Sequence, residues 1–254
     1  MSRSKSKPIA IVSGVAVVAV LAGVASYTAT RPPSPGASGS SSVAEVSADP
    51  SAGVYAELEG YARRDASDKL ALGRVDAPVV LIEYADFKCG YCGKFARDTE
   101  PVLVKKYVEK GVLRIEWRNF PIFGEESEAA ARASWAAGQQ GRFWEFHKAA
   151  YAEGAKEKGF GEERLAALAK EAGVPDLARF RQDRLGAVSR EAVSVDRGQG
   201  YDLGVSSTPS FLINGRPIAG AQPLEAFTEA IEAAAKAAPS KGASSKGASS
   251  KGAR

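Results

Sequence analysis

The hydrophobic and polar positions of the chain separate one long apolar stretch, a central region with regular periods, and two low-complexity segments. The apolar stretch, residues 9–27, contains 19 residues without a charge. A helix that rises ~1.5 Å per residue crosses most of the hydrocarbon core of a bilayer at this length. Residues 28–53, rich in Pro, Gly and Ser, predict a flexible linker, and the Ser-Lys-Gly-Ala-Ser repeat of residues 240–254 predicts a disordered tail.

The residues around the apolar stretch favour a retained membrane anchor. Three basic residues precede the stretch, and positive charges beside a first span tend to stay in the cytoplasm. The alternative is a cleaved signal peptide, which would have a shorter apolar region and a clear small-x-small site, for which Val24-Ala25-Ser26 is a weak match. We therefore expect residues 1–8 in the cytoplasm, a single-pass signal anchor at 9–27, and the following residues on the outer face of the membrane.

The central region opens with a β-α-β unit. The apolar run Val79-Val80-Leu81-Ile82 predicts a buried strand. Residues 94–110 predict a helix that ends at Gly111, and residues 112–117 predict a second strand. Upstream of this unit, residues 58–69 show only a loosely amphipathic pattern.

The second half of the central region changes to a helical pattern. From residue 126 to about 201 the chain contains several Ala-rich helical segments, which we interpret as an all-helical insertion. The segments are separated by breaks near residues 138–141, 158–159 and 173–175. Residues 210–219, with the turn Asn214-Gly215 at their centre, predict a hairpin, and residues 223–238 predict a closing helix. The predicted order is βαβ, helices, ββα, which is an α/β fold.

The chain contains two cysteines, Cys89 and Cys92, separated by two residues. This number excludes the disulfide framework of small secreted proteins. A structural zinc site needs about four Cys or His ligands, and the sole histidine is His147, so the sequence predicts no metal site. Thiol-disulfide exchange or an incidental local disulfide remain as uses of the pair.

The formal net charge of +4 comes from the ends of the chain. Residues 1–7 carry three positive charges and residues 240–254 carry four, with no acid in either segment, so residues 8–239 are net acidic at −3. A nucleic-acid footprint needs basic residues clustered on a folded face. The charge pattern therefore excludes nucleic acid as a main partner.

The position of the cysteines suits exchange chemistry. Cys89 falls at the turn between the first strand and the helix, where free backbone N–H groups and the helix dipole favour a thiolate, and Lys88 adds a neighbouring cation. Cys92, one turn further in, would be shielded and would act as the resolving thiol. A C-x-x-C motif at a strand–helix junction inside a β-α-β unit is a strong signal of redox function.

These residues also carry a family resemblance. The relevant stretch is Asp76-Ala77-Pro78-Val79-Val80-Leu81-Ile82-Glu83-Tyr84-Ala85-Asp86-Phe87-Lys88-Cys89-Gly90-Tyr91-Cys92. It resembles the DsbA-like family of bacterial thioredoxin-fold thiol-disulfide oxidoreductases, and the resemblance runs from about Leu72 to Ala235. It implies a thioredoxin fold over residues 54–239 with a helical insertion. It also implies a cis-proline at Pro209 facing the disulfide, with Thr208 presenting its backbone to substrate peptides.

Three further residues have a functional and a structural interpretation. Glu83 matches the place where family members keep a carboxylate beneath the active site, where it would shuttle the proton of the resolving cysteine; the alternative is a partly exposed strand residue. Asp86 is interpreted as a loop or capping acid, with tuning of the thiolate as the alternative. His147 is interpreted as a hydrogen-bonded packing residue rather than a catalytic base, and the aromatic residues around it as core.

The residues near the cysteines also bear on the direction of electron flow. The Gly-Tyr pair between the cysteines and the threonine before Pro209 resemble the disulfide isomerase branch. Isomerases of that type carry a separate dimerisation domain, for which residues 31–70 are too short. We therefore expect a monomeric oxidase without a cofactor, which introduces disulfides into exported proteins at a bacterial cell membrane. The resemblance implies reoxidation by a quinone-linked membrane partner of the DsbB or vitamin K epoxide reductase type. Isomerase or reductase activity is the alternative, followed by a non-catalytic thioredoxin-fold binding module.

Overall fold

The computed structural model describes residues 53–238, which belong to one unit of the chain. The expected anchor at residues 9–27, nearly all of the expected linker and the expected tail at residues 240–254 lie outside the described residues. Within residues 53–238, every helix is too short or too polar to span a membrane.

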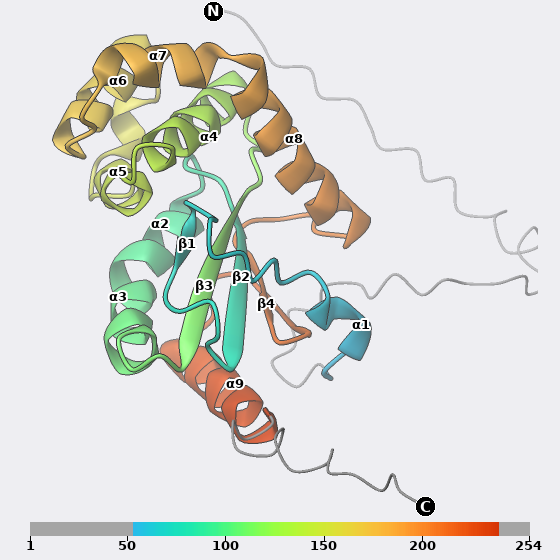
Figure 1. Cartoon of the computed structure of the whole chain (residues 1–254). Helices are drawn as coiled ribbons and strands as arrows, with labels where there is room; N and C mark the ends of the chain where they lie inside the picture. The colour runs from blue at the N-terminus through green and yellow to red at the C-terminus, as the bar shows by residue number, and fades with distance from the viewer. Residues whose placement is uncertain (1–52, 239–254) are drawn as a thin grey trace, which may run out of the picture. The chain divides into compact units, whose positions relative to one another are not determined.

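A mixed sheet with the strand order β1-β3-β2-β4-β5 forms the centre of the fold (Figure 1). The strands are β1 (Ala71–Leu72), β2 (Val79–Ala85), β3 (Leu113–Asn119), β4 (Ser210–Ile213) and β5 (Arg216–Ala219). β2 and β3 are parallel, and the other neighbouring pairs are antiparallel. All residues of β2 and β3 are buried, because helices cover both faces of these central strands.

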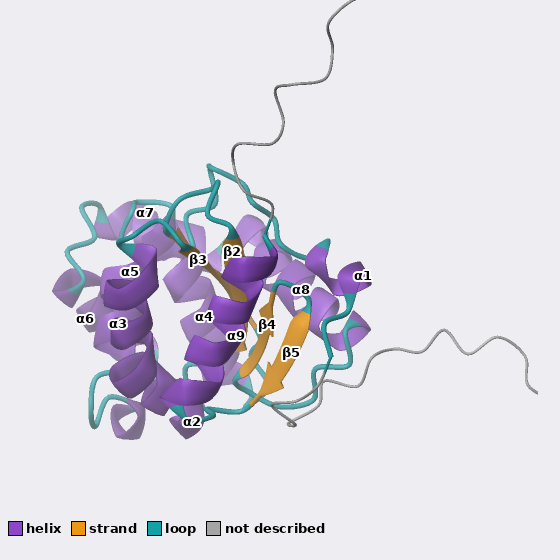
Figure 2. Cartoon of the chain, turned by 90° about the horizontal axis from the view of Figure 1, so that it is seen from below, coloured by secondary structure: helices purple, strands orange, loops and turns teal. Residues whose placement is uncertain are grey.

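Helices account for most of the remaining described residues. They are α1 (Ala56–Glu59), α2 (Gly90–Lys94), α3 (Glu100–Leu103), α4 (Glu125–Gly138), α5 (Phe143–Ala150), α6 (Glu162–Glu171), α7 (Leu177–Leu185), α8 (Ala187–Asp202) and α9 (Leu224–Ala237), with the π-helical turns Phe95–Thr99 and Val104–Val108 and the 3₁₀ turn Lys156–Lys158. Helices α4 to α7 lie together beyond one end of the strands (Figure 1), and α9 lies across β2 and β4 (Figure 2).

The alternation of side chains along β2 sorts them between two apolar clusters. Val79 and Leu81 face the helical segment 90–108 and α9. Val80, Ile82 and Tyr84 face the opposite way, toward α1 and the end of α8. A third cluster joins the helical insertion to the end of β2 and to both cysteines. The insertion therefore packs directly on the segment that carries the C-x-x-C motif.

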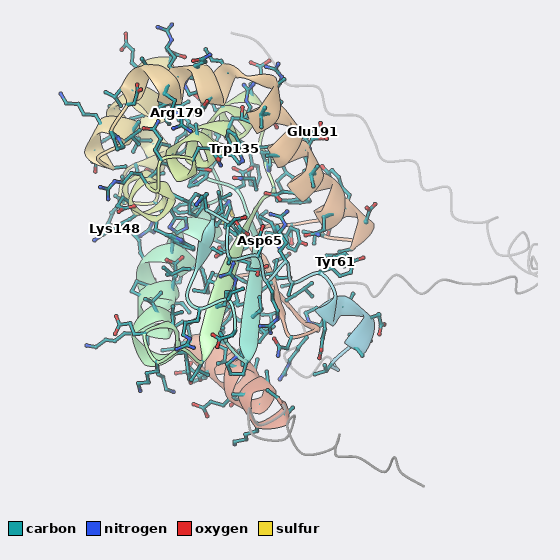
Figure 3. All side chains as sticks on the ribbon, in the orientation of Figure 1. Tyr61, Asp65, Trp135, Lys148, Arg179 and Glu191 are labelled. Carbon is teal, nitrogen blue, oxygen red and sulfur yellow. The ribbon has the colours of Figure 1, made fainter. Side chains whose placement is uncertain are left out.

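The predicted elements are present, with differences at their ends. The first helical segment begins at Gly90, four residues before its predicted start, and two π-helical turns interrupt it. The hairpin turns at Asn214-Gly215, with φ of 42° and 79°, as the Asn-Gly pair predicts. Helices α4 to α8 fill the predicted insertion, and the side-chain view places Trp135 on α4 (Figure 3).

The amphipathic pattern at residues 58–69 does not continue as a helix, since α1 ends at Glu59. Instead the backbone N–H groups of Arg63 and Arg64 donate to the carboxylate of Glu116 on β3, at 2.9 and 2.8 Å. Because these backbone N–H groups bind the buried Glu116 carboxylate rather than helix carbonyls, the segment crosses the sheet as a loop. Strand β1 follows this loop, and its two residues are too few to produce a sequence signal.

Candidate active site

Cys89 is the N-cap of α2, and its backbone is extended, with φ −76° and ψ 119°. The turn before it is held by Asp86, whose carboxylate accepts hydrogen bonds from the backbone N–H groups of Lys88 (2.8 Å) and Ile122 (2.7 Å). The Tyr151 hydroxyl donates to the backbone carbonyl of Asp86 at 2.9 Å. Asp86 is therefore a loop acid that joins the motif to the segment after β3, in agreement with the first of its two interpretations.

The two thiols, both reduced, have opposite electrostatic environments. The pKa of Cys89 is lowered from 9.0 to about 6, first by a hydrogen bond from the Cys92 side chain and then by Thr208 and backbone N–H groups at the helix start, while burial acts in the opposite direction. The backbone N–H of Cys92 lies 3.4 Å from Cys89 Sγ. Cys92 has no exposed surface, and burial raises its pKa well above its usual value. Near neutral pH, Cys89 is a thiolate and Cys92 is a thiol.

The Lys88 side chain does not have the role that its position in the sequence indicated. Its Nζ forms an ion pair with the carboxylate of Glu126 at 2.7 Å, and the causes that lower the Cys89 pKa are hydrogen bonds. The thiolate is therefore stabilised by donors at the helix start rather than by the neighbouring lysine.

The segment before β4 brings a distant part of the chain to the thiol. The Thr208-Pro209 peptide bond is cis, as the family resemblance implied. Cys89 Sγ lies 3.2 Å from the backbone carbonyl oxygen of Thr208, although 119 residues separate them. Thr208 and Pro209 are thus placed beside the thiol that is nearer the surface.

Glu83 lies on the same face of β2 as Val79 and Leu81, which is the face covered by the helical segment of the cysteines. Its side chain has no exposed surface, and neither carboxylate oxygen has a hydrogen-bond partner. Its pKa is raised well above its usual value, first by burial and then by the nearby charges of Glu100 and Cys89. Of its two interpretations, the structure selects the buried carboxyl.

His147 lies in the insertion, on α5, and packs against aromatic rings, including Trp117 and Tyr151 at centroid distances of 5.0 and 4.9 Å. The packing of His147 agrees with the expectation. The expected hydrogen bond is not found at its Nε2, which has no partner. Burial lowers the pKa of His147 to about 3, so the imidazole is neutral.

A groove next to Cys89 contains residues that the sequence pattern did not single out. Phe123 and Tyr91 expose 50% and 69% of their surface there, and Lys156 reaches it from the insertion. Phe123 follows β3 and Lys156 lies in a 3₁₀ turn, so no periodicity marks them as neighbours of the thiol. The groove therefore offers aromatic surface and a cation next to the reactive sulfur.

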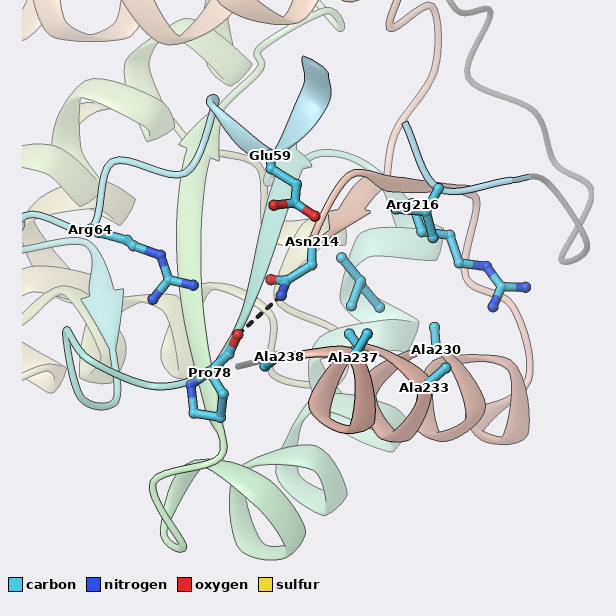
Figure 4. A pocket seen from close by; sticks show the side chains of 12 residues that line it. Glu59, Arg64, Pro78, Asn214, Arg216, Ala230, Ala233, Ala237 and Ala238 are labelled. Carbon is cyan, nitrogen blue, oxygen red and sulfur yellow. Dashed lines mark hydrogen bonds between the residues drawn. The ribbon is translucent and has the colours of Figure 1, made fainter. Parts of the chain in front are cut away.

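A second cavity, of about 450 Å³, lies at the opposite end of β2, next to Pro78 and the alanine-rich face of α9 (Figure 4). Asn214 closes it on one side by donating to the Pro78 carbonyl at 3.0 Å. Neither cysteine lines this cavity. The thiol chemistry is therefore confined to the end of β2 where the strand meets α2.

A C-x-x-C motif at a helix N-terminus, beside a cis-proline and above a buried carboxyl, defines a thioredoxin-fold thiol-disulfide oxidoreductase. A family model described as thioredoxin matches residues 65–233, more than half of the chain. The chain belongs to this family and, within it, to the DsbA-like thiol-disulfide oxidoreductases.

Three known proteins illustrate the relationship. The chain is 33% identical over 155 residues to a probable disulfide bond formation protein D of Bacillus cereus, covering 59% of this chain and 71% of the relative. It is 39% identical over 170 residues to the Na⁺/H⁺ antiporter NhaA 1 of Salinispora arenicola, covering 64% of this chain but only 24% of the antiporter. The oxidised BdbD structure from Bacillus subtilis has a TM-score of 0.62 and 24% identity, covering 68% of this chain and 95% of that one, which shows the shared fold.

Proposed function

We propose that this protein introduces disulfide bonds into exported proteins through the Cys89–Cys92 pair. The observation that carries the proposal is the contrast between the thiols: Cys89 has a pKa of about 6 at a helix N-terminus, and Cys92 is buried as a thiol. The first is suited to leave or attack as a thiolate, and the second is suited to resolve a mixed disulfide.

The proposed reaction has two exchange steps. A substrate thiolate attacks Cys89 Sγ of the enzyme disulfide, the Cys89–Cys92 bond breaks, and Cys92 leaves with the electron pair and takes a proton from Glu83. A second substrate thiolate then attacks the substrate sulfur of the mixed disulfide. A substrate disulfide forms and Cys89 leaves as a thiolate, so two electrons have passed to the enzyme. The scheme moves one proton, which Glu83 donates and Cys92 accepts.

The stabilised thiolate favours the oxidase direction. At pH 7, lowering the thiol pKa from 9.0 to about 6 stabilises the reduced enzyme about tenfold, which raises the potential of the couple by about 30 mV. Gly90 and Tyr91 between the cysteines, and Thr208 before the cis-proline, favour the alternative of isomerase or reductase activity. A non-catalytic binding module would have no need for two thiols with opposite environments.

Substrates would bind in the groove beside Cys89. The backbone of Thr208 and Pro209 would form main-chain hydrogen bonds with an extended peptide. Tyr91 and Phe123 would offer apolar surface to the side chains of that peptide. An unfolded chain with a free cysteine fits such a surface, because it can present backbone and apolar groups together.

The location and partners are proposed from the sequence. Residues 9–27 would anchor a monomer to a bacterial cell membrane, with residues 54–239 on the extracytoplasmic side. A quinone-linked membrane protein of the DsbB or vitamin K epoxide reductase type would reoxidise Cys89 and Cys92. Mass spectrometry of the mature N-terminus tests the anchor, since a protein cleaved after Val24-Ala25-Ser26 would begin at Tyr27.

The activity is tested with a reduced, unfolded substrate and the oxidised enzyme. Cys89→Ser is expected to abolish substrate oxidation, while Cys92→Ser is expected to trap a mixed disulfide through Cys89. Substrate oxidation that survives Cys89→Ser would refute catalysis by this pair. The direction is tested by equilibrating the couple with glutathione: a potential near that of thioredoxin, about −270 mV, would replace the oxidase proposal with a reductase.

A further inference from the structure

The buried carboxylates of residues 53–238 fall into two kinds. Glu116, on the face of the sheet opposite Glu83, accepts hydrogen bonds from Arg114 Nε and Arg118 Nη2, both at 2.9 Å, and its pKa is lowered. Glu83 and Glu100 are buried without such partners: both oxygens of Glu83 and Oε2 of Glu100 are unpaired. An uncompensated buried acid is costly, so two of them close together call for a functional explanation.

The two unpaired acids, Glu83 and Glu100, lie in the interior near the thiols, and Glu100 is also close to the unpaired His147. Glu100 begins α3, eight residues after Cys92 on the same helical segment, and its charge reaches Glu83. His147 Nε2, on α5 of the insertion, lies 3.6 Å from Glu100 Oε2, and neither atom has a hydrogen-bond partner. Three elements thus converge on one interior cluster, which we call the acid–imidazole cluster: Glu83, Glu100 and His147.

Glu100 is the member of the acid–imidazole cluster whose side chain is most exposed to solvent. The Glu83 side chain has no exposed surface and that of His147 has 3%, whereas that of Glu100 keeps 10%. The other groups that face the cluster are the two cysteines and the Tyr151 hydroxyl, whose pKa is raised well above its usual value. Tyr151 is occupied as a donor to the Asp86 carbonyl, so Glu100 is the member placed to exchange a proton with solvent.

We propose that Glu100 and His147 are positioning residues that act through Glu83 and complete a buried proton relay for Cys92. When Cys92 attacks the mixed disulfide at Cys89, its S–H bond breaks and the proton passes to the Glu83 carboxylate. The Cys89–Cys92 bond forms, and the partner sulfur leaves with the electron pair. The proton then passes to Glu100, where the neutral imidazole of His147 accepts its hydrogen bond before release to solvent. This relay rests on the proposed function: attack by Cys92 resolves the mixed disulfide with the reoxidising partner, and the same relay in reverse supplies the proton that Cys92 takes when a substrate opens the enzyme disulfide.

The titration behaviour of the cluster supports this arrangement. Burial raises the pKa of Glu100 to about 8, and the charge of Glu100 adds to the burial that raises the pKa of Glu83. Glu100 therefore changes its protonation near the pH at which thiol exchange operates, and Glu83 holds its proton more tightly than an exposed carboxyl does. Removing the Glu100 carboxyl removes the repulsion at Glu83, so Glu83 should ionise at a lower pH.

The test measures the Cys92 step directly, with dithiobis(nitrobenzoate) as the probe and the reduced protein in a stopped-flow instrument. Cys89 releases the first thionitrobenzoate, and Cys92 releases the second in a first-order step whose rate is followed against pH. In Glu100→Gln the pH midpoint of the second release should fall by about one unit or more. Glu100→Leu, which removes the same charge with an apolar side chain, should lower the midpoint as well.

The role of His147 is tested by coupling. His147→Phe keeps an aromatic ring in an aromatic setting, and it should shift the midpoint when Glu100 is present but leave it unchanged in Glu100→Gln. The matched control is Glu128→Gln, a partly buried carboxylate on α4 that pairs with Arg197 at 3.0 Å, for which the midpoint should stay at the wild-type value.

The outcomes separate the relay from the proposed function. An unchanged or raised midpoint in both Glu100 variants overturns the relay, and an equal shift by His147→Phe with and without Glu100 removes His147 from it. If the wild-type protein releases both thionitrobenzoates and oxidises a reduced substrate, the proposed function stands whichever way the midpoint moves. If the second release does not depend on Cys92, the proposed function itself fails.

Discussion

The stabilisation of the Cys89 thiolate gives the sharpest test of the site. The largest cause of its low pKa is the hydrogen bond from the Cys92 side chain, and Thr208 and the backbone N–H groups of the helix start add to it. Replacing Cys92 by alanine removes that donor and leaves the backbone donors in place. Replacing it by serine keeps an O–H donor at the same position, so Cys92→Ser is the matched control.

The expected magnitude follows from the strength of a hydrogen bond to a charged group. Such a bond contributes about 1.5–3 kcal/mol, and one pKa unit corresponds to about 1.4 kcal/mol. The pKa of Cys89, about 6 in the native protein, should therefore rise by about one to two units in Cys92→Ala. With a pKa near 7.5, the thiolate fraction at pH 7 would fall from about nine tenths to about a quarter.

The assay is the rate of iodoacetamide alkylation against pH, with the ultraviolet absorbance of the thiolate as a second measurement. Each variant has a single cysteine, so both signals report Cys89 alone. The midpoint in Cys92→Ala should exceed that in Cys92→Ser by at least about one unit. Equal midpoints in the two variants would show that the helix start alone stabilises the thiolate, and the assignment of the main cause to Cys92 would be wrong.

Two further predictions concern stability, measured by urea unfolding. Glu116→Gln should cost about 3–5 kcal/mol, because it leaves the buried guanidinium groups of Arg114 and Arg118 without their carboxylate. The pKa of Glu116 is lowered in the folded state, so its contribution is present above its unfolded pKa and should be lost as the pH falls through the folded value; a Glu116→Gln deficit that does not shrink in acid would contradict this. Gly200→Ala on α8 should destabilise by about 1–3 kcal/mol, because the added Cβ would lie 2.5 Å from Phe120. Gly198→Ala on the same helix has nothing within 4 Å and should stabilise by about 0.5–1 kcal/mol; equal effects at the two glycines would argue against the clash.

Much of the site follows from local sequence signals. The C-x-x-C spacing, its position after a buried strand and the helix that follows determine that Cys89 is an N-cap near free N–H groups. The alternation along β2 determines that Glu83 shares a face with Val79 and Leu81. The Asn-Gly turn determines the hairpin at β4 and β5. Each of these signals acts within a few residues, where backbone geometry and side-chain direction are set by the neighbours in the chain.

Only the tertiary structure decided what surrounds these residues. It placed Thr208 beside a thiol 119 residues away, paired Lys88 with Glu126, and covered Glu83 so that neither of its oxygens finds a donor. It also brought Glu100 and His147 together, although no pattern linked them. The physical reason is that the protonation of an acid, a thiol or an imidazole depends on the burial and the charges around it. Those are supplied by elements distant in the sequence, so local periodicity locates the thiols while packing sets their chemistry.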